Sequence, residues 1–283
     1  MKSFKRDNLR DKFNNPKYYC LINPVGKFKW MWDFLMIGLI VYTASYAPYR
    51  TAFMMPETST LLWAVETALD FLFLIDIFVS FITPYERLDG TLECNYKKIS
   101  RNYIFGAILF DVIAVIPTQF FEGSLRFADG LLSELQIEQL TKQLSMLRIL
   151  RIIKVLKLFK YSNLIFKIIG KLNFKATESR ILVIVMGAMF LVHIFACVFY
   201  LTARMKDFSA DTWVVNRGNL DSSGPDSYAL SMYWAFQTLT TVGYGDFGAY
   251  NGMEIMVTCI WMFIGVAFYS FVVGSLTSVI TAV

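Results

Sequence analysis

The sequence has few of the residues with which soluble enzymes and metalloproteins do chemistry. Its 283 residues include one histidine and four cysteines, and the cysteines do not follow the spacing of a metal site. The chain contains no Ser-His-Asp or Cys-His arrangement and no phosphate-binding loop. These absences argue against the common hydrolases and nucleotide-binding enzymes, so we expect neither enzyme activity nor a cofactor.

Apolar residues, by contrast, are abundant. They make up 56% of the sequence, and the mean hydropathy is +0.48, whereas soluble domains are roughly 45–50% apolar. Apolar stretches of membrane-spanning length lie at 33–55, 61–83, 103–121, 131–160, 180–203 and 252–282, and a stretch at 227–239 is too short to span. The pattern predicts an all-α membrane protein with six transmembrane helices and one re-entrant helix.

The charges between these stretches predict an orientation. Residues 1–29 carry eight lysines and arginines against two aspartates, and the loop after 121 is acidic. The positive-inside rule therefore places the N-terminus in the cytosol, and the net charge of +5 reflects this topology and not nucleic-acid binding. No signal peptide is visible in the first thirty residues. We expect a multi-pass protein of the plasma membrane, with an intracellular membrane as the alternative, and no disulfides.

A short motif with two glycines follows the re-entrant stretch: Thr240-Thr241-Val242-Gly243-Tyr244-Gly245-Asp246. Glycine at every second position permits backbone angles that turn successive carbonyl oxygens toward one axis, where they can replace the water around a potassium ion. The predicted K⁺-binding residues are Thr241, Val242, Gly243, Tyr244 and Gly245. One loop cannot surround an ion, so the motif predicts a tetramer, whose partners are three further copies of this chain or close homologues. A glycine-rich hairpin turn is the alternative.

In the last part of the stretch 131–160, cations recur at every third position: Arg148, Arg151, Lys154, Lys157 and Lys160. On a helix they trace a narrow stripe. A cation at the bilayer centre costs about 2.5–3.5 kcal/mol, and such a cost indicates a functional role. We interpret the stripe as the gating charges of a voltage sensor. The alternative is a basic amphipathic helix on the membrane surface.

Acidic partners for these cations lie in the neighbouring apolar stretches. Asp70 and Asp76 belong to the second stretch and Asp111 to the third, and acids inside spanning helices usually pair with cations. Phe73 comes one turn before Asp76, so a ring and a carboxylate share one face. These four residues predict a site past which the cations step. Static ion pairs that hold the bundle together are the alternative.

The remaining stretches predict a pore module. Tyr233 and Trp234 lie shortly before the filter, and we expect them to support it and to reach Asp246. Gly265 and Gly274 in the last stretch are either gating hinges or points of close helix packing. The predicted domains are a cytosolic segment (1–29), a four-helix voltage-sensor bundle (30–160), a linker (161–177) and a two-helix pore module with the re-entrant helix (178–283).

The order of these parts resembles voltage-gated-type cation channels, within them the superfamily that carries cyclic-nucleotide-binding domains: ether-à-go-go, plant Shaker-like, cyclic-nucleotide-gated and hyperpolarisation-activated channels. The resemblance covers most of residues 24–282. It rests on Trp32-Asp33, Phe73-Leu-Ile-Asp76-Ile, Phe110-Asp111-Val-Ile-Ala-Val-Ile-Pro117, Leu147-Arg148-Ile-Leu-Arg151, His193-Ile-Phe-Ala-Cys197 and Ile264-Gly265 with Gly274, beside the filter.

This resemblance carries several implications. Thr241, Val242, Gly243 and Tyr244 would coordinate the ion, and Phe73, Asp76 and Asp111 would form the gating-charge transfer region. Tyr244 and Asp246 depart from the animal ether-à-go-go filter and match the plant Shaker-like filter, which favours potassium over mixed cations. The relatives continue into a nucleotide-binding domain, so a cyclic nucleotide is a partner only if such a domain exists beyond these residues.

The expected function is therefore a voltage-dependent, potassium-selective channel in the lipid bilayer. One alternative is a weakly selective cation channel of the same build. The other is a non-conducting structural or regulatory subunit of a larger membrane assembly.

Overall fold

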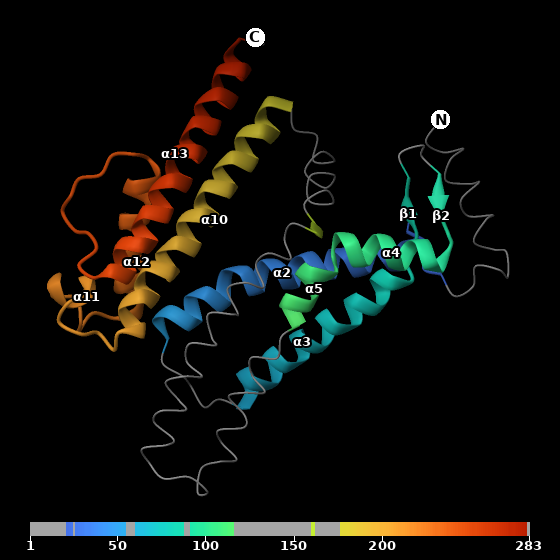
Figure 1. The fold of residues 1–283 in the computed structure, drawn as a ribbon, viewed down its shortest axis with the longest axis horizontal. Helices are drawn as coiled ribbons and strands as arrows, with labels where there is room; N and C mark the ends of the chain where they lie inside the picture. The colour runs from blue at the N-terminus through green and yellow to red at the C-terminus, as the bar shows by residue number, and fades with distance from the viewer. Residues whose placement is uncertain are drawn as a thin grey trace, which may run out of the picture. The chain divides into compact units, whose positions relative to one another are not determined.

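The structure is a computed structural model that describes residues 21–24, 26–54, 60–87, 91–115, 160–161 and 176–281. The chain divides into two compact units, which we describe separately. The first comprises Met1–Tyr42 and Thr58–Ser162, and the second comprises Thr43–Glu57 and Asn163–Val283. Helix α2 (Lys27–Phe53) contributes residues to both units (Figure 1).

The first unit contains α3 (Thr60–Phe81), the strands β1 (Tyr85–Glu86) and β2 (Leu92–Glu93), α4 (Tyr96–Gly106) and α5 (Ile108–Val115). The two strands form an antiparallel hairpin, which the hydropathy pattern did not predict. Helix α3 packs against both α4 and α5. Arg87 and Lys98 both form ion pairs with the Glu93 carboxylate, which joins the hairpin to the start of α4.

The third apolar stretch differs from the single helix expected over 103–121. Helix α4 begins earlier, at Tyr96, because the Asn95 side chain accepts a hydrogen bond from the Lys97 N–H at 3.0 Å. It ends at Gly106, and α5 starts after Ala107. Hydropathy missed the first turns of α4 because only one face of them is apolar.

The second unit contains α10 (Ala176–Met205), α11 (Trp213–Asn216), α12 (Gly224–Leu239) and α13 (Gly252–Ile280). Helix α10 packs against α12 and α13, which also contact each other, and Figure 1 shows the three lying side by side. Side chains cap two of these helices. The Ser223 hydroxyl accepts a hydrogen bond from the Asp226 N–H at 3.3 Å, and Asn251 Oδ1 accepts one from the Glu254 N–H at 3.1 Å.

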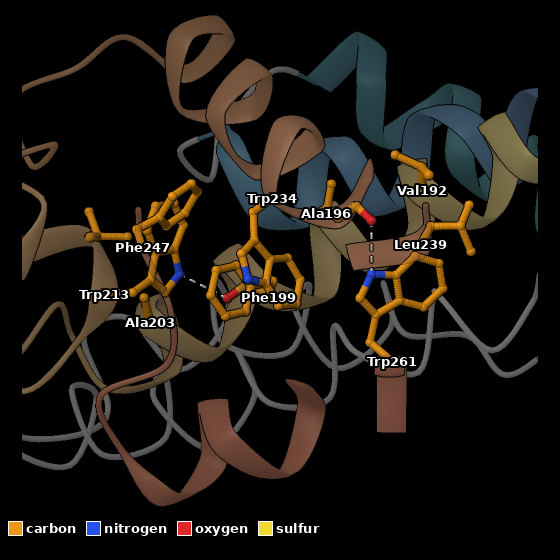
Figure 2. Close-up of a cluster of buried hydrophobic side chains, with 11 residues drawn as sticks. Val192, Ala196, Phe199, Ala203, Trp213, Trp234, Leu239, Phe247 and Trp261 are labelled. Carbon is orange, nitrogen blue, oxygen red and sulfur yellow. Dashed lines mark hydrogen bonds between the residues drawn. The ribbon is translucent and has the colours of Figure 1, made fainter. Parts of the chain in front are cut away.

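Tryptophan side chains bind the three helices into one core (Figure 2). The ring of Trp234 on α12 stacks on Phe199 of α10, with centroids 3.6 Å apart. Trp261 on α13 donates from Nε1 to the Ala235 carbonyl at 3.0 Å, and Trp213 donates to the Phe199 carbonyl at 3.3 Å. Because the indole N–H groups of Trp213 and Trp261 have backbone partners, these two rings are buried without an unpaired donor. The core therefore fixes α12, from which the glycine motif continues.

Two charged residues tie the segments around this core together. Glu254 is fully buried, and its carboxylate accepts hydrogen bonds from the N–H groups of Trp213 at 3.1 Å and Tyr250 at 2.9 Å. Arg204, in the last turn of α10, donates to the carbonyls of Thr51, Ala52 and Met54 near the end of α2. A cation at the carboxyl end of a helix satisfies carbonyls that lack helical partners.

Two described helices are long and apolar enough to cross a membrane: Glu178–Met205 within α10 and Gly252–Ser278 within α13. Few of their side chains are buried inside the chain, so their apolar surfaces must meet lipid or other protein. They correspond to the fifth and sixth predicted spans. A largely helical chain with such helices fits an all-α membrane protein, whereas the count of six spans stays a prediction.

Candidate functional site

The glycine motif adopts an alternating backbone. Thr241, Gly243 and Gly245 have φ angles of 59°, 57° and 72°, in the left-handed region. Glycine adopts this region without a steric penalty, whereas threonine is strained there. The alternation expected from the two glycines therefore extends one step earlier than the glycines themselves.

Backbone amides of the motif are turned toward α12. The Thr241 N–H donates to the Thr238 carbonyl at 3.1 Å, and the N–H groups of Val242 and Gly243 donate to the Gln237 carbonyl at 3.0 and 3.3 Å. In a planar trans peptide the preceding carbonyl points the opposite way from the N–H. The carbonyls of Thr240, Thr241 and Val242 therefore face away from α12, which is the arrangement that a row of ion-coordinating oxygens requires.

Gln237 connects this loop to the helix behind it. Its side-chain Oε1 accepts the Tyr244 N–H at 3.0 Å, and its Nε2 donates to the Asp246 carboxylate at 3.2 Å. The side chain is only 5% exposed. Because its amide meets both an N–H and a carboxylate, one residue fixes the middle and the carboxyl-terminal end of the motif.

The two aromatic residues expected to support the filter take different positions. The Tyr233 hydroxyl hydrogen-bonds with Asp246, and its ring lies nearly parallel to that of Tyr244, with centroids 6.4 Å apart. Trp234 turns instead into the core against Phe199. Trp234 therefore belongs to the packed core and supports the motif only through the position of α12.

Asp246 is also contacted from the segment between α10 and α12. Arg217 donates to its backbone carbonyl at 2.7 Å, has a guanidinium nitrogen 3.9 Å from its carboxylate, and lies over the Phe247 ring. Desolvation raises the pKa of the Asp246 carboxyl, but hydrogen bonds from Gln237 and Tyr233 and the Arg217 charge outweigh it, so the pKa is lower than usual. The carboxylate is therefore held in its charged form.

A second polar site lies in the first unit, where Lys160 meets two buried carboxylates. Its Nζ is 2.9 Å from Asp76 Oδ2 and 2.6 Å from Asp111 Oδ2, and it also donates to Ser80 at 2.9 Å. Both aspartates have no exposed surface. A buried ion pair of this kind is stable only when further hydrogen bonds satisfy the remaining polar atoms.

Those further hydrogen bonds come from aromatic side chains. The Tyr161 hydroxyl lies 2.9 Å from both carboxylate oxygens of Asp76, and Trp32 Nε1 donates to Asp76 Oδ1 at 3.0 Å. The Tyr103 hydroxyl donates to Asp111 at 2.5 Å. We call this group of residues around Lys160, Asp76 and Asp111 the charge site.

Several predicted residues lie beside the charge site or beyond the described residues. Phe73 is buried one turn before Asp76 on α3. Asp70 lies six residues before Asp76 on α3 and is half-buried. The other four predicted gating charges, Arg148, Arg151, Lys154 and Lys157, lie outside the described residues.

The two candidate hinge glycines have different surroundings within the chain. A Cβ at Gly265 would lie 3.5 Å from the Thr238 carbonyl oxygen and 3.6 Å from the Leu239 Cα, whereas one at Gly274 would meet no described atom within 4 Å. Gly265 therefore lies where α13 packs closely on the end of α12.

Sequence reasoning missed three residues that these sites use. Gln237 has a signal in the sequence, because it follows Tyr233 by four residues and so shares its helix face. Tyr161 is next to the last predicted gating charge. Arg217 has no such signal, since its segment was expected only as a polar connection.

Comparison with known proteins identifies the family. A match to the ion transport protein family covers residues 29–282, so the chain belongs to this family. The chain is 27% identical over 263 residues to potassium channel AKT3 of Oryza sativa subsp. japonica, covering 92% of this chain and 27% of that protein. It is 26% identical over 292 residues to potassium channel KAT6 of the same plant, covering 99% of this chain and 46% of that protein.

An animal relative is similar to the same degree. The voltage-gated inwardly rectifying potassium channel KCNH2 of Sus scrofa is 27% identical over 283 residues, covering 89% of this chain and 22% of that protein. The chain thus spans less than half the length of each of these relatives. The predicted resemblance to voltage-gated-type potassium channels is confirmed at the level of the family, which is one of channels and not of enzymes.

Proposed function

Because the chain belongs to the ion transport protein family, we propose that it is a voltage-dependent, potassium-selective channel that conducts K⁺ passively through a tetrameric pore. The observation that carries this proposal is the backbone of the glycine motif. Its amides are turned toward α12 and its carbonyls away from it, and its left-handed residues alternate with residues that lack a positive φ.

Selectivity for potassium is supported by how the motif is held. The pore-lining oxygens belong to the backbone, and Gln237, Tyr233 and Arg217 hold the segment from behind and from its outer end. Carbonyl oxygens held in this way replace the hydration shell of K⁺. The carboxyl end of α12 also points its negative dipole toward the loop, which favours a cation. K⁺ is the permeant ion, and we expect no other cofactor.

A tetramer is supported by the large apolar area that the chain leaves uncovered. Val242 and Tyr244 of the motif are 53% and 71% exposed in the single chain, and Phe263 on α13 is 79% exposed. A single motif contributes carbonyls to one side of an ion only, so three further copies or close homologues would complete the coordination. The remaining apolar surface would face the lipid bilayer, in the plasma membrane.

Voltage dependence is supported by the charge site. Lys160, a cation of the regular stripe, forms ion pairs with the buried carboxylates of Asp76 and Asp111. The buried Phe73 lies one turn before Asp76 on α3. Each charge that crosses the field is worth about 2.3 kcal/mol per 100 mV, so three per subunit would suffice to bias a pore. Gating currents test this assignment: Arg151→Gln and Lys154→Gln are expected to reduce the total charge, and an unchanged total charge would rule out a sensor.

One recording in cells with varied external potassium tests conduction and selectivity together. We expect the reversal potential to follow the potassium gradient and to shift strongly when sodium replaces potassium. A small shift in that exchange would point to a weakly selective channel of the same build. Purified protein that gives no potassium flux in liposomes at any voltage would point to a non-conducting subunit.

A further inference from the structure

The carboxylate of Asp76 receives donors from two sources. Trp32 reaches it from α2, at 3.0 Å, whereas Lys160 and Tyr161 reach it from the end of the cationic stretch, each at 2.9 Å. Asp76 is fully buried and Tyr161 is 5% exposed. The two neighbouring residues of the cationic stretch therefore share one acceptor.

A step of three residues along the stripe would bring a different pair to Asp76. Lys157 would then take the place of Lys160, and Leu158 would take the place of Tyr161. The residues that follow the five cations are Ile149, Ile152, Val155, Leu158 and Tyr161. Four of these are aliphatic, so only the last position supplies a hydroxyl. The contact between a hydroxyl and Asp76 is thus specific to one register of the stripe.

We propose that Tyr161 is a positioning residue of the charge site, which makes the register with Lys160 at Asp76 more stable than the registers with the four earlier cations. This inference rests on the proposed voltage sensing. An aliphatic side chain in place of Tyr161 leaves the cation as the stripe's only donor to Asp76, and hydrogen bonds to a charged group are stronger than those between neutral groups.

The topology gives the direction of the effect. With a cytosolic N-terminus, the cationic stretch runs from the outer to the inner side, so Lys160 is its innermost cation. When Lys160 occupies the charge site, the other four cations lie on the outer side, which is the position that depolarisation favours. Tyr161 therefore stabilises the depolarised position of the sensor.

Tyr161→Phe tests this because it removes the hydroxyl and keeps the ring, whose centroid lies 5.4 Å from Lys160 Nζ. Loss of a hydrogen bond to a carboxylate changes an equilibrium about tenfold. For a sensor that moves three charges, a tenfold change, or 1.4 kcal/mol, shifts the charge–voltage curve by about 20 mV to more positive voltages. The total gating charge is expected to stay the same.

Tyr103→Phe is the matched control. In the wild type the Tyr103 hydroxyl donates to Asp111 at 2.5 Å. Because Tyr103 lies on α4 and not on the cationic stretch, removal of its hydroxyl acts on every register alike. A smaller shift of the charge–voltage curve is therefore expected. In a second variant, Leu158→Tyr added to Tyr161→Phe moves the hydroxyl one step along the stripe. We expect that variant to stabilise the register with Lys157, so that the charge moves in two components.

Three results would overturn the proposal. The first is a Tyr161→Phe curve that superimposes on the wild type, and the second is a shift no larger than that of Tyr103→Phe. In both, gating currents are present and only the role of Tyr161 fails. The third is the absence of any gating current in the wild-type protein, which would overturn the proposed voltage sensing as well.

Discussion

Replacement of Gln237 by leucine is the sharpest test of how the filter is held. Leucine has nearly the same size, but it removes the acceptor of the Tyr244 N–H and a donor to Asp246. The Tyr244 N–H, left without its acceptor, costs about 1–3 kcal/mol, and the contact that holds Asp246 is lost with it. Gln237→Leu therefore destabilises the filter of each subunit by about 1–3 kcal/mol.

This free energy is large enough to measure as a change in conduction. At 2 kcal/mol, the ratio of conducting to collapsed filters falls by a factor of about 30. The assay is the rate at which current declines during a maintained step, with surface protein counted in parallel. Potassium that binds the conducting filter stabilises it by mass action, so the decline is expected to be fast in low external potassium and slower in high potassium.

Gln237→Glu is the matched variant, because it keeps the acceptor for the Tyr244 N–H. The introduced carboxyl lies beside Asp246, and a like charge raises its pKa above the ordinary value of about 4.3. Below that raised pKa the acid is protonated and donates to Asp246, as the amide does. Conduction should therefore recover as external pH falls.

The wild-type filter is expected to depend on pH in the opposite direction, losing stability as the pH falls. The pKa of Asp246 is lowered, so the stability that its carboxylate provides is present above about pH 3.9 and is lost only as the pH falls through the lowered value. Wild-type conduction is expected to change little between about pH 5 and 8. A Gln237→Leu channel with a wild-type rate of decline, or a Gln237→Glu channel without pH dependence, would refute the reasoning.

Three further variants probe the surroundings of the filter. Arg217→Gln should speed the decline of current in low potassium several-fold, with Arg217→Lys intermediate because lysine keeps the charge and loses the planar fork; equal rates in both would contradict a role for guanidinium geometry. Glu254→Gln should lower the free energy of unfolding in detergent by about 1–3 kcal/mol, since glutamine keeps an acceptor oxygen for only one of the N–H groups of Trp213 and Tyr250; an unchanged melting temperature would count against it. Gly265→Ala should open normally and Gly265→Leu should not, because the helix contact there leaves room for a methyl group only; impaired opening in Gly265→Ala would favour the hinge.

Much of the filter region could be predicted because its geometry follows from the backbone angles that glycine permits. Glycine at positions 243 and 245 signals the left-handed angles that the structure has, and the hydropathy pattern located α12 and α13 to within a few residues. The left-handed Thr241 could not be predicted in this way, because threonine has no such preference. Its conformation follows from the hydrogen bonds that the loop makes to α12.

The supports of the two sites were harder to predict because they join residues far apart in the sequence. The spacing placed Asp76 and Asp111 near the cationic stripe, but it did not indicate which hydroxyl or indole would complete their hydrogen bonds. Arg217 reaches the filter from 29 residues away. Such contacts depend on how the loop before α12 folds, and a pattern of hydropathy or charge contains no information about that.

The two sites use a hydrogen-bonded carboxylate in different ways, and this difference has a physical consequence. All the donors to Asp246 come from one packed module, where Gln237 and Tyr233 share a helix fixed by the core. Two of the donors to Asp76 belong instead to the segment that would move. In the proposed voltage-dependent channel, the hydrogen bonds at the filter can therefore all be retained while the sensor changes register, whereas those from Lys160 and Tyr161 to Asp76 must be exchanged. In a protein that responds to voltage, the strength of the Asp76 contacts sets the voltage at which the sensor moves, and the strength of the Asp246 contacts sets how long an open pore conducts.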